Sequence, residues 1–468
     1  MNVLLISTYE LGRQPFGLAS PAAWLRDAGA TVNCLDLSRE PFNEDFVRAA
    51  DVVAFYVPMH TATRLAVQLI EPVRKLNPRT HICFYGLYAP MNEEYLRKLG
   101  AQTILGGEFE EGLLHFVERL AGVAQASSLC AQPEPIISLA RQNFRAPDRR
   151  SLPPLEQYAH LIVPGGAHHV VGYTEASRGC KHLCRHCPIV PVYNGVFRVV
   201  QRDIVLADIR WQVGAGAQHI TFGDPDFFNG PAHALAIVEA LHREFPQVTY
   251  DVTIKVEHLL KHAGHLRTLR DTGCLFVTSA VESVDDAVLA KLDKGHTRAD
   301  FLAVVELCRE VGLVLHPTFV PFTPWTTLES YAELLRVLTE NDLIESVAPI
   351  QLAIRLLIPA GSRLLELEEV RSMVAPFDEE ALVFPWRHAD PRVDALCEEV
   401  EQLVRSGEKL DVSRGKIFAR ICDAASAACP EQSRGAADAA GIPERWQRRE
   451  PVLVSRAAIP YLNEPWYC

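Results

Sequence analysis

Three cysteines stand close together near the middle of the chain, in the run from Ser177 to Pro188. Cys180, Cys184 and Cys187 follow a C-x3-C-x2-C spacing, and no fourth cysteine follows locally. Thiolates at this spacing can bind three irons of a cubane cluster. The fourth iron then stays open to another ligand. The run therefore predicts a 4Fe-4S centre with one site left for chemistry.

Other interpretations of this run compete. A zinc site could use Cys180, His182, Cys184, His186 and Cys187. Structural zinc, however, normally closes with two separated ligand pairs, and the remaining cysteines are scattered singly. A bacterial ferredoxin run needs C-x2-C-x2-C-x3-C-P, of which only the end at Pro188 is matched. Three structural thiols fit poorly, because Lys, Arg and His interleave them and Gly179 gives the loop conformational freedom.

The cysteine spacing resembles the signature of the radical SAM superfamily. That resemblance implies an enzyme whose open iron chelates the amino and carboxylate groups of S-adenosylmethionine. The reduced cluster would cleave the sulfonium to give a 5′-deoxyadenosyl radical, with an electron donor such as flavodoxin or ferredoxin as partner. The alternative is an iron–sulfur redox or electron-carrier protein in which the barrel only holds the cluster.

Length and composition set the wider frame. At 468 residues the chain exceeds the ~250–300 residues at which single cores stop growing, so two or three domains are expected. A content of 48% hydrophobic and 22% charged residues is globular, and the net charge of -12 argues against a general nucleic-acid or acidic-membrane binder. Neither a signal peptide nor a membrane span is expected. The 12 cysteines indicate free thiols in a reducing cytoplasm.

Residues 1–122 predict a doubly wound, Rossmann-like α/β domain, because short β-branched runs alternate with segments of helical period. Strands are expected near Asn2–Ser7, Thr31–Leu37, Asp51–Pro58, Thr80–Tyr85 and Gln102–Gly106. The clearest helix is expected at Thr63–Leu76. Such a domain binds ligands at the carboxyl ends of its strands.

The run from Leu105 to Glu111 resembles the end of the cobalamin-binding domains of cobalamin-dependent radical SAM enzymes. This resemblance implies bound cobalamin and methyl transfer, with a rim at Thr8–Arg13, Met59–Thr61 and Gly86–Pro90. The first of these loops contains no histidine, so the D-x-H-x-x-G motif that supplies a lower axial ligand is absent. A Rossmann-like module that binds nothing is the alternative.

Residues 123–170 are expected to be a linker, because Ala, Gln, Ser and Pro replace the periodic pattern. Residues 171–367 then alternate strands and helices as a partial (β/α)6 barrel, whose active site lies at the strand carboxyl ends. We expect strands near Tyr173–Ser177, His219–Gly223, Thr249–Ile254, Cys274–Ala280, Leu313–Phe319 and Ile350–Leu356.

Candidate cofactor contacts follow the second and fourth of these strands. Gly223 and Asp224 resemble a Gly-rich acidic element that contacts the amino group of the methionine moiety, and Asp226 stands next to it. A tight Asp-Pro turn with helix-capping acids is the alternative.

The run from Val281 to Thr297 resembles a V-E-S…K-G-H-T segment of radical SAM cores. The resemblance implies that Glu282 or Ser283 binds the ribose. Ser283 could instead cap the next helix. His296 is a weak candidate for a proton relay.

Arg355 interrupts an apolar run on the sixth expected strand. A buried arginine needs an anion, which here is either a cofactor or substrate carboxylate or an acid of the protein. We favour the cofactor or substrate, because the strand should face the cluster.

Residues 368–468 predict a mostly helical C-terminal region. A helix is expected at Pro391–Arg405 with Asp390 as its N-cap, followed by a poorly packed Ala-rich segment at 418–441. Cys422 and Cys429 are expected to be small buried fillers.

The last residues, from Ile459 to Cys468, resemble the tail of a radical SAM family named for ending in Cys-Cys-Ala-Glu-Pro, or with selenocysteine second. The resemblance implies a selenoprotein whose UGA codon after Cys468 was read as a stop. Cys468 is then a candidate redox residue, since thiolate reactivity depends on exposure and neighbours. An unreactive exposed terminus is the alternative.

Overall fold

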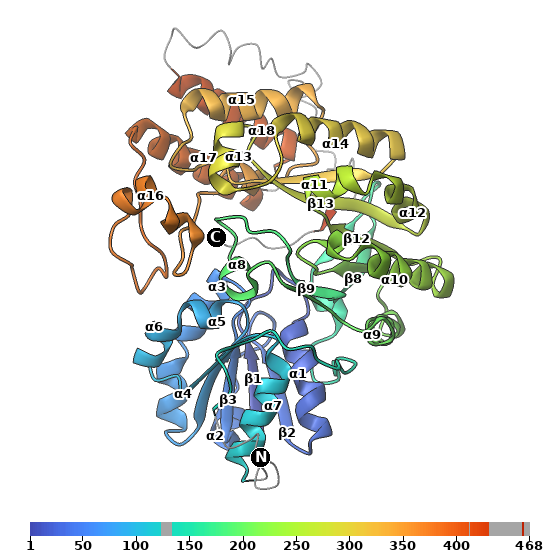
Figure 1. Ribbon diagram of the computed structural model, residues 1–468, viewed down its shortest axis with the longest axis vertical. Helices are drawn as coiled ribbons and strands as arrows, with labels where there is room; N and C mark the ends of the chain where they lie inside the picture. The colour runs from blue at the N-terminus through green and yellow to red at the C-terminus, as the bar shows by residue number, and fades with distance from the viewer. Residues whose placement is uncertain (123–132, 411, 430–460, 463–468) are drawn as a thin grey trace.

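The computed structural model describes residues 1–122, 133–410, 412–429 and 461–462. Two sheets dominate it, one in the N-terminal part and one in the middle of the chain, with C-terminal helices beside the second (Figure 1). The cluster loop lies where the two parts meet. Among the described residues, no helix has the length and apolar character that a membrane crossing requires.

The N-terminal sheet is parallel, in the order β2-β1-β3-β4-β5-β6. Its strands are β1 (Asn2–Ser7), β2 (Thr31–Asp36), β3 (Val52–Tyr56), β4 (His81–Tyr85), β5 (Thr103–Gly107) and β6 (Ile137–Ser138). The first five match the predicted strands to within two residues. Alternate residues of β1 enter two separate cores, with Leu4 and Ile6 on one face and Val3 and Leu5 on the other. Helices cover both faces, as a parallel sheet requires.

The covering helices are α1 (Phe16–Asp27) and α7 (Phe109–Leu120) on one face, and α2 (Glu44–Ala49), α3 (His60–Val67), α4 (Ile70–Leu76), α5 (Tyr88–Met91) and α6 (Glu93–Lys98) on the other. The predicted helix Thr63–Leu76 is wrong as one element, because α3 and α4 are separate. Pro72 explains the break. Its ring would clash with the carbonyl of Gln68 in a continuous helix, and it has no N–H to donate.

Residues 133–170 do more than link two domains. They add β6 to the first sheet and β7 (His160–Ile162) to the second, with the 3-10 turn η3 (Leu155–Gln157) between. Arg149 is buried, donating to both oxygens of Asp208 at 2.7 and 2.9 Å, to Gln14 Oε1 and to the Tyr173 carbonyl. The segment is therefore part of both cores.

The second sheet has the order β14-β13-β12-β11-β8-β7-β15 and curls into a half-barrel. Its parallel strands are β8 (His168–Thr174), β11 (His219–Phe222), β12 (Thr249–Thr253), β13 (Cys274–Glu282) and β14 (Val314–Phe319). The helices between them include α9 (Arg202–Gly214), α10 (Pro231–Glu244), α11 (Val256–Lys261), α12 (Leu266–Asp271), α13 (Asp286–Leu292) and α14 (Arg298–Val311). The prediction placed β11 to β14 to within two residues but began β8 late.

The sixth predicted barrel strand, Ile350–Leu356, is wrong. The 3-10 helix η6 (Pro349–Leu352) occupies its first half, and only an isolated bridge joins Arg355 to Phe322. Short apolar runs fit a strand and a buried helical segment equally well, and here Pro349 starts the helical turn. The antiparallel strands β7 and β15 (Tyr461–Leu462) extend the opposite edge instead.

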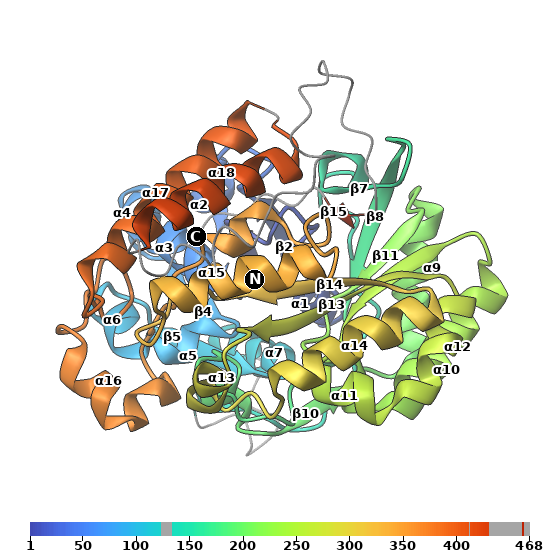
Figure 2. The ribbon, with the colours of Figure 1, turned by 90° about the horizontal axis from the view of Figure 1, so that it is seen from above.

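The helices α15 (Leu328–Glu340), α17 (Pro391–Lys409) and α18 (Arg414–Ala428) pack beside the half-barrel (Figure 2), and the short α16 (Glu368–Met373) lies between α15 and α17 in the chain. Asp390 caps α17 by accepting from the Arg392 N–H, as predicted. The expectation of poor packing at 418–441 is wrong for its first part, because Phe418 and Ile421 belong to the main core. Residues 430–441 lie outside the described chain. Cys422 and Cys429 are buried.

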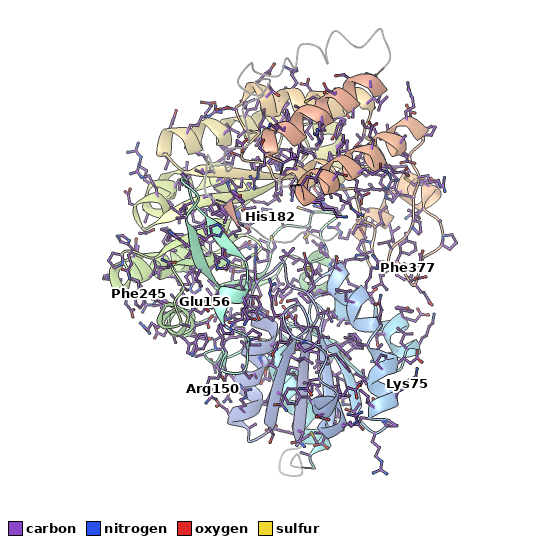
Figure 3. All side chains as sticks on the ribbon, turned by 180° about the vertical axis from the view of Figure 1, so that it is seen from behind. Lys75, Arg150, Glu156, His182, Phe245 and Phe377 are labelled. Carbon is purple, nitrogen blue, oxygen red and sulfur yellow. The ribbon has the colours of Figure 1, made fainter. Side chains whose placement is uncertain are left out.

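Replacing Arg149 by Met leaves the Asp208 carboxylate buried without its cation. Removing one partner of a buried ion pair costs about 3–5 kcal/mol, so the free energy of unfolding should fall by that amount in denaturant titrations. Arg150→Met is the matched control, since the Arg150 side chain is 76% exposed and lies at the surface in Figure 3. Equal losses in the two variants would contradict a structural role for Arg149.

Candidate active site

The cluster loop follows the carboxyl end of β8. It starts with the short strand β9 (Ser177–Gly179), which pairs with β10 (Phe197–Val199), and the helix α8 (Val190–Tyr193) follows the last cysteine. Gly179 has φ +74°, and a Cβ there would lie 2.4 Å from the Tyr193 ring and the Val196 carbonyl. Only glycine allows the chain to turn into the cysteine run at this point.

The three thiols lie near one another. Burial, together with the charges of Cys184 and Cys180, raises the pKa of Cys187 to about 12. Burial likewise raises the pKa of Cys180. Because burial disfavours free thiolates, a bound cation would favour the ionised forms of Cys180 and Cys187. A compact set of three partly shielded thiols fits the three protein-bound irons of a 4Fe-4S cluster.

The two histidines of the loop, His182 and His186, face different carboxylates. His182 lies near the middle of the molecule (Figure 3), with Nε2 3.5 Å from Asp226 Oδ2, and His258 Nδ1 lies 2.6 Å from the same oxygen. His186 Nε2 lies 3.2 Å from Glu282 Oε1. One ligand atom each of Cys180, His182 and Asp226 lie within 4.8 Å of one another. Any non-thiol ligand on this side of the loop would thus come from His182 or Asp226.

Asp224 holds the start of the cluster loop. Its Oδ2 accepts from the Ala176 N–H at 2.9 Å and its Oδ1 from the Ser177 hydroxyl at 2.5 Å. Burial raises the pKa of Asp224 to about 7. Both oxygens are engaged by the protein, so the structure shows an anchoring role rather than a carboxylate facing open space.

Gly223 and Asp226 stand close to Asp224 in the chain and have different roles. Gly223 lines a cavity, and a Cβ there would lie 1.9 Å from the Tyr173 hydroxyl, so no other residue fits. Asp226 caps the 3-10 turn η4 (Phe227–Asn229) by accepting from the Phe228 N–H. The capping alternative is therefore observed for Asp226, together with its contact to His182.

Glu282 ends β13 in a left-handed conformation, with φ +69°. Burial opposes its ionisation, but the Lys294 ammonium and the His186 imidazole lower the pKa of Glu282 to about 2. Its Oε1 lies 3.2 Å from Lys294 Nζ. The carboxylate thus connects the cluster loop to the segment after α13, a link that the sequence did not indicate.

Ser283 does not cap the next helix. Asp285 does, by accepting from the Ala287 N–H, while Ser283 Oγ accepts from the Asp285 N–H at 3.1 Å. Burial and the nearby cations of Lys294 and Lys255 lower the pKa of His296 to about 4. A ring that is neutral at pH 7 is a poor relay near neutrality.

Arg355 has an acid of the protein as its partner. It donates to Asp394 Oδ1 at 2.7 Å and to the Trp386 carbonyl at 2.9 Å, and its guanidinium lies 3.6 Å from the Trp386 ring centroid. The expectation of a cofactor or substrate carboxylate depended on a sixth strand that does not form. Asp394 comes from α17, far along the chain, so its pairing with Arg355 was not visible in the sequence.

Sequence reasoning also missed the ion network at the domain junction. Arg178 donates to both oxygens of Glu110 at 2.8 and 2.6 Å and to Glu175 at 2.6 Å. Tyr193 donates to Glu108 Oε1 at 3.0 Å. The acids after β5 thus join the N-terminal domain to the cluster loop, a role that the resemblance of the run from Leu105 to Glu111 did not indicate.

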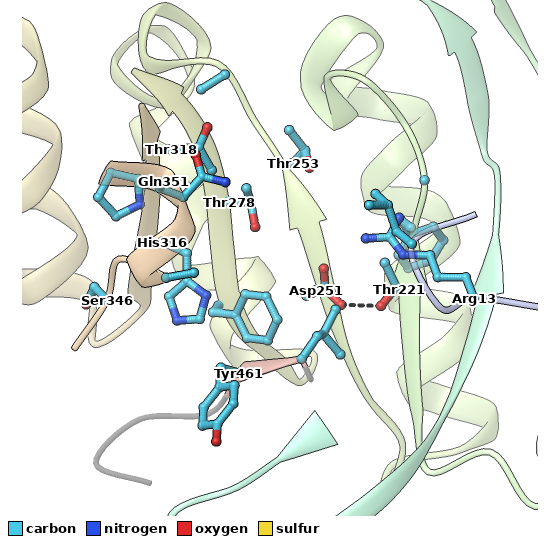
Figure 4. Close-up of a pocket in the computed structure, with 18 of the residues that line it drawn as sticks. Arg13, Thr221, Asp251, Thr253, Thr278, His316, Thr318, Ser346, Gln351 and Tyr461 are labelled. Carbon is cyan, nitrogen blue, oxygen red and sulfur yellow. Dashed lines mark hydrogen bonds between the residues drawn. The ribbon is translucent and has the colours of Figure 1, made fainter. Parts of the chain in front are cut away.

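Two cavities adjoin this junction. One, of about 250 Å³, lies between the N-terminal sheet and the cluster loop, and the other, of about 340 Å³, lies inside the half-barrel (Figure 4). Leu11, Arg13 and Gly223 line both. The three loops predicted as a rim all contribute to the first cavity, through Glu10, Met59 and Leu87 among others. No histidine lines that cavity within the described chain.

A family model of the radical SAM superfamily matches residues 174–338. These residues form a radical SAM domain. The matched residues begin at the last residue of β8. They include the cluster loop and the parallel strands β11, β12, β13 and β14.

Curated relatives are distant and overlap only part of the chain. The tRNA-2-methylthio-N(6)-dimethylallyladenosine synthase of Desulfosudis oleivorans is 25% identical over 228 residues, which is 46% of each chain. The ribosomal protein uS12 methylthiotransferase RimO of Parabacteroides distasonis is 25% identical over 35% of this chain and 40% of its own. The bacteriochlorophyllide d C-8(2)-methyltransferase of Chlorobaculum tepidum is 26% identical over 20% of this chain and 22% of its own. The chain thus spans less than half the length of these relatives.

Solved structures show the same fold over more of the chain. The cobalamin-dependent S-adenosylmethionine radical enzyme OxsB, with aqua-cobalamin bound, matches with a TM-score of 0.67 and 14% identity, over 87% of this chain and 67% of its own. The radical S-adenosylmethionine methyltransferase TsrM from Kitasatospora setae, with cobalamin and a [4Fe-4S] cluster, matches with a TM-score of 0.58 and 16% identity, over 73% of each chain. The predicted fold class is confirmed.

Replacing Cys180, Cys184 or Cys187 by Ala should abolish cluster binding, because each thiol holds one iron and no spare thiol lies in the run. Iron content and visible absorbance after anaerobic reconstitution are the measurements. Cys422→Ala, which removes a buried thiol from α18, is the control and should retain full iron. Full iron content in any of the three loop variants would refute the ligand assignment.

Arg355→Ala should leave iron content and S-adenosylmethionine affinity unchanged. It removes a charged hydrogen bond to Asp394, so the free energy of unfolding should fall by about 1–3 kcal/mol. Equilibrium dialysis with labelled S-adenosylmethionine and denaturant titration separate the two effects. A loss of cofactor affinity at unchanged stability would restore the cofactor-binding role expected from the sequence.

Proposed function

We propose that the chain is a radical SAM enzyme whose three loop cysteines hold a 4Fe-4S cluster. The observation that carries the proposal is the set of three adjacent thiols on the loop after β8, whose flanking residues Gly179 and Ile189 line a cavity. When bound and reduced, the cluster and S-adenosylmethionine together supply a 5′-deoxyadenosyl radical that abstracts hydrogen. The substrate is not named by any of these features.

The protein's own residues position this chemistry. Cys180, Cys184 and Cys187 bind the metal, and Asp224 fixes the entry to their loop through the Ser177 hydroxyl. Gly223 lets the Tyr173 ring pack closely against the strand end, beside both cavities. It remains our candidate for a contact to the cofactor. Glu282 and Ser283 remain our candidates for contacts to the ribose, with Glu282 held ionised by its two basic neighbours.

Cobalamin is the second proposed cofactor, bound between the N-terminal sheet and the cluster loop. The support is the position of that cavity at the carboxyl ends of β1, β3 and β4, together with the cobalamin in both structural neighbours. Since no described histidine lines the cavity, the protein would bind cobalamin without an imidazole on the cobalt. Its volume of about 250 Å³ is below the ~300–1,000 Å³ of sites for drug-sized ligands, so the lining loops must move apart to admit a corrin.

The test of the main proposal is S-adenosylmethionine cleavage by the anaerobically reconstituted protein with dithionite. We expect 5′-deoxyadenosine and methionine from the wild type and neither from Cys184→Ala. A protein with a full, redox-active cluster that forms no 5′-deoxyadenosine would support the alternative, an iron–sulfur electron carrier. Flavodoxin and ferredoxin are the proposed physiological reductants, and either should replace dithionite.

The test of cobalamin binding is retention of added hydroxocobalamin through gel filtration, with its absorption spectrum recorded. We expect a spectrum without imidazole coordination and a lower cobalamin content in Leu87→Trp, which fills the cavity while the iron content stays unchanged. Leu120→Trp, at an exposed position on α7, is the control. Equal retention by all three proteins would argue against this cavity as the site.

The finer family assignment rests on the tail. We propose membership of the family named for its Cys-Cys-Ala-Glu-Pro or selenocysteine-containing end, with Cys468 as a redox residue, on the resemblance of the run from Ile459 to Cys468. Cys468 lies outside the described residues. The gene sequence after its codon decides the matter: a UGA codon followed by Ala-Glu-Pro codons supports the assignment, and any other continuation contradicts it.

A further inference from the structure

The cavity inside the half-barrel has several polar side chains in an otherwise mostly apolar wall. Because side chains alternate along a strand, residues two apart face the same side. The inward residues are Thr221 on β11 with Gly223 directly after it, Asp251 and Thr253 on β12, Phe276, Thr278 and Ala280 on β13, and His316 and Thr318 on β14. The volume of about 340 Å³ falls in the range of small-molecule sites. Such walls suit a small ligand that makes several hydrogen bonds.

The open side of the half-barrel is closed by C-terminal residues. Tyr461 and Leu462 of β15 line the cavity, as does Arg414 of α18. Figure 4 shows Tyr461 and His316 at the end of the cavity away from Thr253 and Thr318. Gly223, at the carboxyl end of β11, belongs to the cluster side. The cavity therefore has a second end, distinct from the one that adjoins the cluster loop.

Arg414 is a partly buried cation at this second end. Its guanidinium donates to the Glu345 carbonyl at 2.6 Å and lies 4.3 Å from the Tyr461 ring centroid. Burial lowers the pKa of Arg414, and the carboxylates of Glu345 and Glu408 oppose this shift from a distance. Among the described residues, neither carboxylate forms a direct ion pair with the guanidinium. Arginine presents several donors that match a carboxylate. A ligand carboxylate would supply the missing partner.

Asp251 offers the opposite charge. Thr221 Oγ1 donates to Asp251 Oδ1 at 2.6 Å, and His219 Nε2 lies 2.9 Å from the same oxygen. No described group donates a hydrogen bond to Oδ2, although Asp251 lines the cavity. The buried Nε2 of His316 likewise has no hydrogen-bond partner among the described residues. Buried polar groups are normally satisfied, so these atoms mark where a ligand would bind.

We propose that this end of the barrel cavity binds a small amino-acid-like substrate, its carboxylate against Arg414 and its amino group against Asp251. The threonine hydroxyls of the cavity wall supply the remaining hydrogen bonds. The proposal deepens the proposed radical SAM function. It rests on that function because only a radical SAM reaction makes the bound ligand a substrate. A molecule held here would lie in the cavity that Gly223 joins to the cluster side.

Isothermal titration calorimetry on the full chain without its cluster tests the proposal. The probes are the common α-amino acids, each compared with its carboxamide and with the carboxylic acid that lacks the amino group. We expect at least one free amino acid to bind, and both of its analogues to bind at least tenfold more weakly. No binding of any amino acid at millimolar concentration would overturn the proposal.

Two variants assign the contacts separately. Arg414→Ala should bind the amino acid and its carboxamide equally well. Asp251→Asn should bind the amino acid and the carboxylic acid that lacks the amino group equally well. Arg420→Ala, at an exposed position on α18, is the matched control and should bind as the wild type does. Because Arg414 also contacts Tyr461, Asp251→Asn provides a test that does not depend on β15 staying in place. Unchanged preferences in both variants would overturn the proposal.

The outcomes separate this proposal from the radical SAM function. Calorimetry needs no cluster and no turnover. Binding that depends on Arg414 and Asp251, in a protein that never cleaves S-adenosylmethionine, would refute the radical SAM function alone. Cleavage in a protein that binds none of the probes would refute the substrate class alone.

Discussion

The buried guanidinium of Arg178 sets the arrangement of the two halves of the molecule. It lies two residues before the first cluster cysteine and takes its carboxylates from both sides, Glu110 from the N-terminal domain and Glu175 from the segment after β8. Leaving one partner of such a pair buried alone costs about 3–5 kcal/mol. The cluster loop can therefore adopt its position at low free energy only when the N-terminal domain is docked beside it.

Further carboxylates hold the loop in the same manner. Asp224 binds the start of the loop at Ser177, and Asp226 faces His182 in its middle. Glu282 contacts His186 near the end of the loop. These acids come from the ends of β11 and β13, so the half-barrel determines where the thiols lie. The sharing of Leu11, Arg13 and Gly223 by two cavities follows from this arrangement, because the loop stands between the N-terminal sheet and the barrel.

The sequence predicted the strands well where apolar runs were long and bounded by helices, as in β1 and β11 to β14. It failed where the pattern was ambiguous or a proline intervened, at Ile350–Leu356 and at Thr63–Leu76. The three cysteines were recognisable because their spacing alone carries the chemistry. The partners of Arg178 and Arg355 were not, because Glu110 and Asp394 are distant in sequence and only the folded chain brings them together.

The pairing of β15 with β7 has a consequence for biosynthesis. β7 is made before any parallel strand of the half-barrel, whereas Tyr461 and Leu462 are made after all of them. A growing chain on the ribosome can therefore fold both sheets and the cluster loop while one wall of the barrel is still missing. The end of the barrel lumen that Tyr461 and Leu462 line therefore stays open until almost all of the described chain has been made.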